Sequence, residues 1–433
     1  MYYYIITIGC QMSKADSERI ATFLEDNGYK QQEDWSQADL IILTTCGVRQ
    51  SAEDRAYGLV GRICKLNPKA RIVIAGCLAK RKDVQKRLAG KVDLFMPIDE
   101  LPNLLKLLKN CRSGNLLGND NLKKISAGEY LTIRPKHESS FSAYVPIGNG
   151  CNNFCSYCVV PYARGPEVYR PADDIITEVK DLIGEGYKEI ILIAQNVNSY
   201  QSGQINSPKL LGELAALPGN FWLRFFSSHP KDLSAELISV LASSDKICQH
   251  LHVAVQSGDD EILETMNRKY TVAHFRSLIE KIRQTKPGIV ITTDAIVGFP
   301  GETKKQFLNT VKLFKDMNFD MAYISIYSPR PGTVSWNMKD DVSREEKKHR
   351  EKVLLDILET NSKNNNNGYI GKELTVLVEG INKRGKYYGK NSGFKTIRFI
   401  VPVELSQEDI VGNFVKVKIN KIVGNNLEGE LIK

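Results

Sequence analysis

The chain has 433 residues, of which 42% are hydrophobic and 25% are charged. This length suffices for about three domains that each bury a core, and the composition excludes a disordered chain, a collagen-like fibre and a small disulfide scaffold. The 59 Lys and Arg residues exceed the 50 Asp and Glu residues, which gives a net charge of +9. Such an excess is compatible with an anionic partner but does not identify one.

The nine cysteines bear on the compartment in which the protein works. They are odd in number, and the first ten residues lack the basic segment, apolar stretch and cleavage site of a secretory signal. No apolar run approaches the ~20 residues that a membrane span needs. We therefore expect a cytoplasmic protein without a membrane anchor, whose reduced thiols serve metal binding or catalysis.

Short apolar runs alternate with helical patterns in the first third of the chain. Strands are expected at residues 2–8, 38–44 and 71–75, with a fourth candidate at 92–96, and helices at 14–27, 52–66, 80–88 and near 101–108. Continuous apolar strands separated by helices are typical of a parallel sheet covered on both faces. The periodicity weakens between about residues 110 and 135, where we place a linker after a first domain of residues 1–125.

The middle of the chain repeats one unit six times. Apolar strands are expected at residues 141–147, 189–194, 222–227, 250–255, 290–297 and 321–327, and helical patterns follow the first five, for example at 173–183, 233–241 and 304–317. Six such units in series predict a closed or partly closed β/α barrel with right-handed crossovers, which we assign to residues 137–365. Sites on such sheets lie at the carboxyl ends of the strands, so residues there are the functional candidates.

The last part of the chain changes character. A helical pattern at residues 343–361 runs into an Asn tract at 363–368, which we expect to be too polar to pack. Beyond it, short alternating strands at 374–379, 396–403, 414–419 and 427–432 predict a small antiparallel barrel of the OB type over residues 368–433. The expected fold is thus α/β: a Rossmann-like parallel-sheet domain, a partial (β/α)6 barrel and a small terminal β-barrel.

Three cysteines stand close together after the first barrel strand: Cys151, Cys155 and Cys158. Three thiolates at this spacing can hold one face of an inorganic cluster and leave one position without a protein ligand. A structural zinc ion would need a fourth Cys or His, and no second pair stands at zinc-finger spacing. We favour a [4Fe–4S] site with one open iron; zinc and a redox-active pair of Cys155 and Cys158 are the alternatives.

Three further cysteines share a position in the first domain, because Cys10, Cys46 and Cys77 each end a separate apolar strand. If those strands are parallel neighbours, their carboxyl ends lie at one edge of the sheet, and the three thiols converge. Gly9 and Gly76 let the backbone turn sharply beside a bulky inorganic group. We therefore expect a second three-cysteine site here. Structural roles are expected for Cys64, Cys111 and Cys248.

The motif Cys-x3-Cys-x2-Cys at the start of a β/α barrel resembles the radical S-adenosylmethionine (SAM) superfamily. An upstream three-cysteine domain and a terminal small barrel resemble the methylthiotransferases within it. The finer resemblance is to the branch of tRNA-2-methylthio-N6-dimethylallyladenosine synthases, and it spans nearly the whole chain. The strings that carry it are Gly9-Cys10-Gln11-Met12, Thr45-Cys46-Gly47-Val48-Arg49, Ala52-Glu53-Asp54-Arg55, Cys158-Val159-Val160-Pro161-Tyr162-Ala163-Arg164-Gly165 and Gln195-Asn196-Val197-Asn198-Ser199-Tyr200.

This resemblance implies a transferase that methylthiolates the adenine C2 of N6-isopentenyladenosine at position 37 of tRNA, beside the anticodon. The implied cofactors are two [4Fe–4S] clusters and SAM, which serves as methyl donor and as radical source. The catalytic cluster would be held by Cys151, Cys155 and Cys158, and an auxiliary cluster by Cys10, Cys46 and Cys77. The implied partners are tRNA and an electron donor such as flavodoxin or ferredoxin; the sulfur donor is left open and a monomer is expected. Alternative substrates are N6-threonylcarbamoyladenosine in tRNA and an aspartate of a ribosomal protein.

Other side chains are candidates for contacts with SAM. Tyr157 lies between two of the cysteines, where superfamily members commonly border the SAM adenine with an aromatic ring. Gln195, Gln256, Asp294 and Gly298 stand at strand ends, where they could hydrogen-bond SAM or substrate or could instead cap helices. Four arginines could bind carboxylate or phosphate, although surface exposure is the commoner role: Arg164, Arg170, Arg268 and Arg330.

A basic stretch without acidic residues lies between Asn382 and Pro402 in the terminal barrel. It resembles the RNA-binding TRAM domain, and cations interleaved with aromatic rings suit phosphate and stacked bases. The expected RNA-binding residues are Lys383, Arg384, Lys386, Tyr387, Tyr388, Lys390, Lys395 and Arg398. A solvated loop over core aromatics is the alternative for this stretch. For the whole chain, the competing hypothesis is an RNA-binding protein with structural zinc and no radical chemistry.

Overall fold

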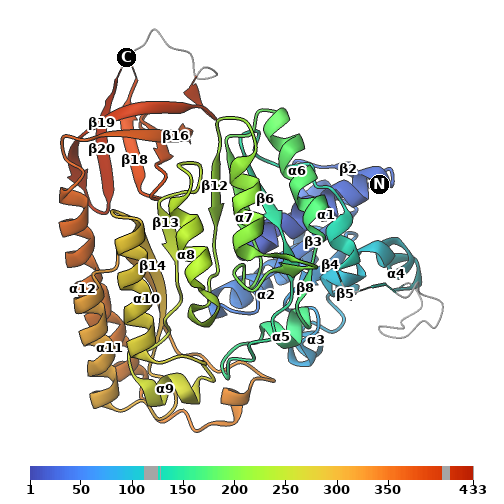
Figure 1. Ribbon diagram of the computed structural model, residues 1–433. Coiled ribbons are helices and arrows are strands. Elements are labelled where there is room, and N and C mark those ends of the chain that lie inside the picture. The colour runs from blue at the N-terminus through green and yellow to red at the C-terminus, as the bar shows by residue number, and fades with distance from the viewer. Residues whose placement is uncertain (112–124, 127, 402–409, 433) are drawn as a thin grey trace.

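The computed structural model describes residues 1–111, 125–126, 128–401 and 410–432. Figure 1 shows an N-terminal sheet domain in blue, a central barrel in green and yellow, and a small red β-barrel at the C-terminus. These parts confirm the predicted α/β fold class. The predicted linker at residues 110–135 falls largely on residues 112–124 and 127, which lie outside the described residues. The last two residues of the strand expected at 396–403 belong to the segment 402–409, which also lies outside them.

The N-terminal domain is a parallel sheet with the strand order β2-β1-β3-β4-β5. Its strands are β1 (Tyr2–Ile8), β2 (Lys30–Gln31), β3 (Leu40–Thr45), β4 (Arg71–Gly76) and β5 (Leu94–Met96). Its helices are α1 (Gln11–Asp26), α2 (Gln50–Leu66), α3 (Lys82–Arg87) and α4 (Leu104–Asn110). Two apolar clusters pack against the sheet, and strand β3 is buried along its whole length, which explains the continuous apolar pattern of these strands.

The central domain is a barrel of six parallel strands that form two three-stranded sheets, β12-β9-β6 and β13-β14-β15. The strands are β6 (Ser142–Pro146), β9 (Glu189–Ile193), β12 (Trp222–Phe225), β13 (His250–His252), β14 (Val290–Val297) and β15 (Met321–Ile326). Single parallel bridges such as Ser228 to Val253 join the two sheets beside β12 and β13. Strands β6 and β15 pair on one side only within the described residues, so the barrel is partly closed.

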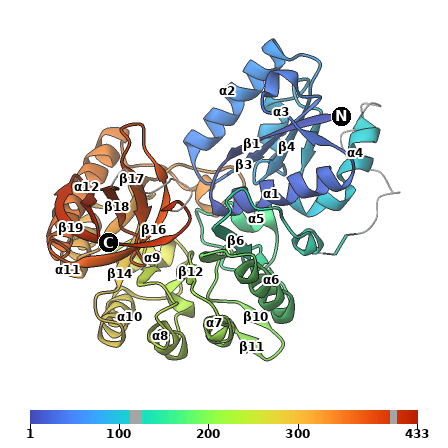
Figure 2. The same ribbon diagram turned by 90° about the horizontal axis from the view of Figure 1, so that it is seen from above.

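Helices cover the outer side of these strands, and Figure 2 shows α6, α7, α8 and α10 in a row there. The barrel helices are α5 (Val160–Arg164), α6 (Ala172–Gly184), α7 (Ser207–Ala216), α8 (Ala235–Ala242), α9 (Asp260–Thr265), α10 (Val272–Thr285) and α11 (Lys304–Met317). Short hairpins complete the domain: β7 (Gly148–Asn149) with β8 (Val168–Tyr169), and β10 (Gln201–Ser202) with β11 (Ile205–Asn206).

The Asn tract does pack, so the prediction that it is too polar was wrong. Helix α12 runs from Arg344 to Asn367, through the tract, towards the C-terminal barrel. Asn366 is fully buried, and its side-chain amide donates to the Asn425 carbonyl (3.4 Å), while Asn365 donates to Asp320 (3.2 Å). Asparagine is tolerated here because partners from other elements satisfy its amide groups.

The C-terminal domain is a closed five-stranded barrel in the order β16-β17-β18-β20-β19. Its strands are β16 (Glu373–Ile381), β17 (Tyr387–Lys390), β18 (Thr396–Ile400), β19 (Phe414–Val423) and β20 (Asn426–Leu431). Two details differ from the prediction: β17 lies inside the basic stretch, where no strand was expected, and β18 pairs with β20 in parallel in an otherwise antiparallel barrel. Among the described residues, no helix is long and apolar enough to cross a membrane.

Candidate functional site

The N-terminal cysteines converge as the sheet topology predicts. Strand β3 pairs in parallel with β1 and β4, in a register that sets Ile8 opposite Thr45 and Thr45 opposite Gly76. Cys46 and Cys77 therefore follow adjacent strand ends directly, and both are 5% exposed. Cys10 lies within hydrogen-bonding reach of Cys46. These three residues are called the N-terminal triad below.

Glycines give the N-terminal triad its close backbone approach. Gly76 has a φ of +84°, and a Cβ there would lie 2.8 Å from the Thr45 carbonyl oxygen. A Cβ on Gly47 would lie 3.3 Å from the side chains of both Cys77 and Val159. Since Val159 directly follows Cys158, the cysteine-bearing loops of the two domains meet at Gly47.

The barrel cysteines, Cys151, Cys155 and Cys158, lie on one loop after β7 and are called the barrel triad below. Cys151 and Cys155 are each 9% exposed, and the Asn153 amide donates to the Cys151 sulfur at 3.5 Å. None of the nine cysteines forms a disulfide. Gly150 shapes the start of this loop, because it has a φ of +84° and a Cβ there would lie 2.0 Å from the Pro166 carbonyl oxygen.

The thiols differ in their electrostatic environment. The contact with Cys46 and the nearby Arg164 hold the pKa of Cys10 well below its ordinary value, and the same contact with burial raises the pKa of Cys46. In the barrel triad, burial raises the pKa of Cys151, and burial with the neighbouring Cys155 raises that of Cys158 to about 12. A bound metal deprotonates a coordinating thiol, so these barrel thiols would ionise together with metal binding.

Each triad has one buried arginine that donates to one of its thiols. The Arg164 Nε donates to the Cys77 sulfur (3.4 Å), and its other nitrogens donate to Asp16 (2.6 Å) and Asn149 (3.0 Å). The Arg268 Nη1 donates to the Cys155 sulfur, also at 3.4 Å. Guanidinium groups stabilise anionic acceptors, so each arginine would offset part of the negative charge on the sulfur that it contacts once that sulfur is bound to metal.

Neither of these arginines is a solvated surface group, and the same holds for the other two candidates from the sequence. Arg164 and Arg268 are 3% and 7% exposed, and Arg170 and Arg330 are 7% and 5% exposed. Arg170 pairs with Glu178 (2.5 Å). Arg330 donates to the carbonyl of Val48 (3.0 Å), two residues after Cys46, and so ties the barrel to the N-terminal domain.

A cavity of about 900 Å³ joins the two triads. Its wall includes Cys10 and Cys46 from the N-terminal domain and Cys158 from the barrel. The rest of the wall includes residues that lie on the barrel strands or directly after them, among them Tyr144, Phe226, His252, Asp294, Tyr323 and Ile326. A group held by either triad would therefore face the same cavity.

The cavity contains three of the five residues predicted to contact SAM. Tyr157, Gln256 and Asp294 line it, and the Asp294 carboxylate accepts from His252 Nε2 at 3.2 Å. Gln256, four residues after the end of β13, has a φ of +69°, an uncommon conformation for a residue other than glycine. Gln195 and Gly298 are not among the residues that line the cavity.

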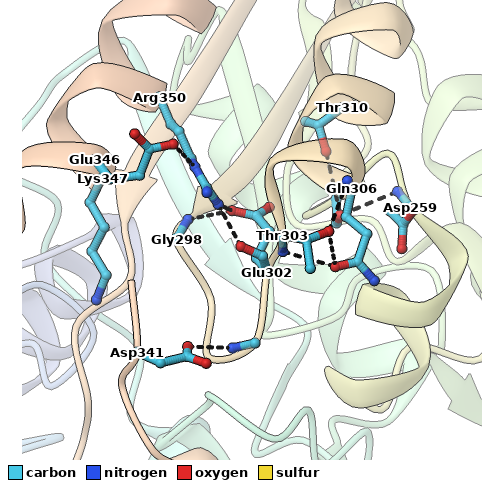
Figure 3. Close-up of polar contacts among 12 residues, drawn as sticks. Asp259, Gly298, Glu302, Thr303, Gln306, Thr310, Asp341, Glu346, Lys347 and Arg350 are labelled. Carbon is cyan, nitrogen blue, oxygen red and sulfur yellow. Dashed lines mark hydrogen bonds and ion pairs between the residues drawn. The ribbon is translucent and has the colours of Figure 1, made fainter. Parts of the chain in front are cut away.

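Gly298 belongs instead to a polar network that supports the end of β14, shown in Figure 3. Its backbone N–H donates to Glu302 Oε2 (2.7 Å), and the same carboxylate accepts from Arg350 of α12 (2.7 Å). A Cβ on Gly298 would lie 2.3 Å from the Lys347 side chain, and its φ is +67°, so glycine is required. Thr303 and Gln306 form a capping box at the start of α11 in the same network.

The residues predicted to bind RNA divide into two groups. Lys383 and Arg384 are exposed in the turn between β16 and β17. Lys386, Lys390 and Lys395 instead pair with carboxylates from outside the basic stretch, namely with Glu428 (3.0 Å), Glu379 (3.0 Å) and Asp320 (2.9 Å), respectively. Tyr387, Tyr388 and Arg398 are half-buried on β17 and β18.

No group of three or more His, Cys, Asp or Glu side chains in the described part of the chain is arranged to hold a single metal ion. An iron–sulfur cluster is larger than one ion and holds its thiolates farther apart. The donor sets fit such clusters chemically, because each triad offers three thiols that form no disulfide, a nearby guanidinium, and a glycine that lets the backbone pack closely beside them. The assignment of both triads as cluster ligands stays a prediction.

Three family models match the chain. The radical SAM superfamily matches residues 145–314, an uncharacterised protein family, UPF0004, matches residues 2–96, and the TRAM domain matches residues 368–432. With the cysteine loop at the mouth of a partial β/α barrel, these matches define the protein as a radical SAM enzyme, which implies SAM and a [4Fe–4S] cluster as its cofactors.

Full-length relatives narrow this class. A tRNA-2-methylthio-N(6)-dimethylallyladenosine synthase of a Thermoanaerobacter species is 40% identical and covers 100% of this chain and 93% of its own. Proteins of the same name from Carboxydothermus hydrogenoformans and Geobacter sulfurreducens are 39% and 38% identical, over 99% and 100% of this chain and 99% and 97% of their own. The chain belongs to the family of tRNA-2-methylthio-N6-dimethylallyladenosine synthases.

Solved structures support the fold. The radical SAM methyltransferase TsrM from Kitasatospora setae, with cobalamin and a [4Fe–4S] cluster bound, superposes with a TM-score of 0.57 at 15% identity. The match covers 77% of this chain and 73% of that chain. At 15% identity this similarity shows only that the two folds are alike, with a barrel that follows another domain.

Proposed function

We propose that this protein methylthiolates the adenine C2 of N6-isopentenyladenosine at position 37 of tRNA. One observation carries the proposal: cysteines of two separate triads line the same cavity of about 900 Å³. A single sulfur insertion site needs the methylthio source and the radical source within reach of one substrate atom. The full-length relatives named as synthases of this modification support the same conclusion.

Cys151, Cys155 and Cys158 would hold the [4Fe–4S] cluster to which SAM binds, and Cys10, Cys46 and Cys77 would hold a second cluster. When bound, these groups supply the radical that activates the adenine carbon and the sulfur that is transferred. The protein's own residues bind these groups, orient the substrate and surround both. Arg164 and Arg268 offer hydrogen bonds to thiolate ligands, and such hydrogen bonds are one determinant of cluster potential.

The cavity wall suits a nucleoside with an apolar substituent. Tyr144, Phe226 and Tyr323 offer aromatic surface, and Ile324 and Ile326 add aliphatic surface. Aromatic faces stack on bases and pack against hydrocarbon groups. An isopentenyl group finds more apolar contact here than the polar threonylcarbamoyl group would, and the basic C-terminal barrel gives a ribosomal protein substrate no advantage.

The cavity polar groups would orient SAM and the base. Tyr157 packs in a small cluster with Met266, Phe299 and Tyr327, so its ring is held rigidly beside Cys158. Gln256 and the His252–Asp294 pair supply hydrogen bonds on the strand side. We assign contacts with SAM to Tyr157, Gln256 and Asp294, and supporting roles to Gln195 and Gly298.

The remaining partners follow from the substrate. The TRAM domain would bind tRNA through the exposed Lys383 and Arg384, with Arg398, Tyr387 and Tyr388 as further contacts. A flavodoxin or ferredoxin would supply electrons. The enzyme would act in the cytoplasm as a monomer, with domains at residues 1–125, 137–365 and 368–433.

Mass spectrometry of nucleosides tests the function. In tRNA from a strain that lacks the gene, we expect 2-methylthio-N6-isopentenyladenosine to be absent and N6-isopentenyladenosine to accumulate. The plasmid-borne gene should restore the methylthiolated nucleoside, and a copy with Cys155→Ala should not. Unchanged methylthioadenosine in the deletion strain would refute the proposal, and loss of a threonylcarbamoyl derivative instead would identify the alternative substrate.

A further inference from the structure

A turn of the C-terminal barrel enters the central barrel from the end opposite the cysteine loops. This turn, residues 391–395, connects β17 to β18. Arg224 of β12 donates from its two terminal nitrogens to the carbonyls of Ser392 (3.1 Å) and Asn391 (3.3 Å), while its Nε pairs with Glu189 (2.9 Å). Arg224 is 1% exposed. The turn is therefore bound inside the barrel by its backbone, through a fully buried cation.

Phe394 is the side chain that this turn inserts. Its ring contacts Phe226 at a centroid distance of 5.3 Å and His250 at 5.1 Å, and the Arg224 guanidinium lies over it at 4.8 Å. Its φ is +63°, a strained conformation for a residue with a bulky side chain such as phenylalanine. Such strain persists only when the surroundings hold the residue in place, and here three side chains of the barrel do so.

Two lysines predicted to bind RNA belong to the same arrangement. Lys395 pairs with Asp320 at 2.9 Å, and both side chains are about nine-tenths buried. Lys390 lies over the Phe394 ring at 4.4 Å and pairs with Glu379. Lys395 thus holds the turn against the central barrel, and Lys390 contacts Phe394 from within the C-terminal domain. Lys383 and Arg384, at a different turn, remain as the exposed cations of the stretch.

Phe394 stands between two cavities. It contacts Phe226, which lines the cavity shared by the cysteine triads, and it follows Gly393, which lines a second cavity of about 660 Å³ between the two barrels. His250 has a similar position, because it packs on Phe226 and follows Gln249 of the second cavity. Phe394 and His250 themselves line neither cavity.

We propose that the 391–395 turn supports the floor of the catalytic cavity from behind and separates it from the second cavity, with Phe394 as a positioning residue for Phe226. A radical reaction needs a site from which water and other reductants are excluded. The C-terminal domain then has two roles on different surfaces: one turn offers charges to RNA, and the other supports one wall of the reaction cavity. This inference rests on the proposed function in one respect only: one of its tests measures the amount of methylthiolated product.

Phe394→Ala, compared with wild type, separates the two roles. In reconstituted full-length enzyme, we expect the affinity for an anticodon stem-loop containing N6-isopentenyladenosine to be unchanged. The amount of 5′-deoxyadenosine released per methylthiolated product should rise several-fold, because an open floor lets the activated site be quenched before transfer. Phe394→Leu, which keeps an apolar side chain, should restore part of the coupling.

The exposed turn provides the matched control. Lys383→Ala with Arg384→Ala should weaken binding of the stem-loop several-fold and leave the ratio of 5′-deoxyadenosine to product at the wild-type value. If Phe394→Ala instead weakens RNA binding and leaves that ratio unchanged, Phe394 is an RNA contact and the inference is wrong.

Amide hydrogen exchange gives a readout that does not depend on tRNA modification. Phe394→Ala should speed exchange in β12 and β13 and leave exchange in the N-terminal sheet unchanged. If the variant and the wild type exchange at the same rate in β12 and β13 as well, the proposed role of the turn is contradicted. If Phe394→Ala does not fold, Phe394→Leu and Lys395→Met must show the same effects in smaller degree, and wild-type behaviour of both would overturn the proposal. Absence of any methylthiolated product from wild type would refute the function, while exchange would still test the floor.

Discussion

The two cysteine triads reach the same cavity in different ways. The barrel triad lies on one loop of eight residues, Cys151 to Cys158, and its spacing is visible in the sequence. The N-terminal triad gathers cysteines from three strand ends, and Cys10 is separated from Cys77 by most of the first domain. A local loop can hold a cluster almost independently of the fold, whereas the second site exists only when β1, β3 and β4 pair in register.

The arginines extend this difference. Arg268 comes from the same domain as the Cys155 that it contacts, but Arg164 reaches from the barrel to Cys77 and Asp16 of the N-terminal domain. Burial raises the pKa of Asp16, although the neighbouring guanidinium opposes this shift. The N-terminal triad thus depends on the interface between domains as well as on its own sheet.

Removing either triad should have the largest effect. Replacement of all three barrel cysteines by Ala should abolish SAM cleavage and methylthiolation together, because the open iron that binds SAM is lost. Replacement of Cys10, Cys46 and Cys77 should abolish methylthiolation and leave SAM cleavage. Chromatography of 5′-deoxyadenosine and of tRNA nucleosides measures both, and equal loss of SAM cleavage in the two variants would contradict the division of roles.

The two arginines should differ in their effect on stability. Arg164→Met leaves Asp16 buried without its partner, so the free energy of unfolding should fall by about 3–5 kcal/mol. Arg268→Met removes a donor but orphans no carboxylate, so a loss of about 1–3 kcal/mol is expected. Urea denaturation measures both variants.

The control for this comparison is the double variant Arg164→Met with Asp16→Leu. It removes both charges and should regain much of the lost stability, since an apolar pair of similar size often replaces a buried ion pair without loss. If the double variant is as unstable as Arg164→Met alone, the ion pair is not the cause.

Acid should destabilise the barrel through two buried neutral histidines. Burial, with Arg268 and Lys231 nearby, lowers the pKa of His229 from 6.5 to about 2. Burial lowers the pKa of His250 as well, and the other groups that contribute are Arg224, His252, Lys395 and Lys390. The unfolded chain binds protons below pH 6.5 that the folded chain does not, so stability is complete above that pH and is lost as the pH falls.

For each histidine, the free energy of unfolding should fall by at most about 1.4 kcal/mol per pH unit as the pH is lowered. Thermal unfolding at pH 7.5, 6.5 and 5.5 measures it. His250→Gln should reduce the slope, and an unchanged slope in that variant would remove His250 from the explanation.

The smallest effect compares two glutamines at strand ends. Gln256 lines the cavity and Gln195 does not. Gln256→Ala should raise the KM for SAM about tenfold, as expected for loss of one or two hydrogen bonds to a ligand. Gln195→Ala should leave that KM nearly unchanged. The opposite order in steady-state kinetics would show that Gln195 turns into the site when SAM binds.

The sequence was sufficient for the fold class, the six barrel strands and the convergence of Cys10, Cys46 and Cys77, because apolar strand patterns and their ends are local signals. It was insufficient where distant residues decide. The Asn tract joins α12 because Asn425 and Asp320 satisfy its amides. Lys386, Lys390 and Lys395 looked free because their carboxylate partners lie outside the basic stretch.

Candidate site residues show the same limit. Arg164 and Arg268 looked like anion-binding groups, but nothing local indicates that a cysteine sulfur accepts from each. Gly298 stood at a strand end as predicted, yet Glu302 and Lys347 occupy its surroundings. Phe394 carried no signal of its position inside another domain.

The central claim is that each of the two triads holds an iron–sulfur cluster. The most direct test counts the clusters in anaerobically reconstituted protein, by iron and sulfide analysis with Mössbauer spectroscopy. We expect two [4Fe–4S] clusters per chain in the wild type. Each triple-alanine variant, of the N-terminal or of the barrel cysteines, should hold one. A single cluster in the wild type, lost only with the barrel triad, would contradict the role of Cys10, Cys46 and Cys77.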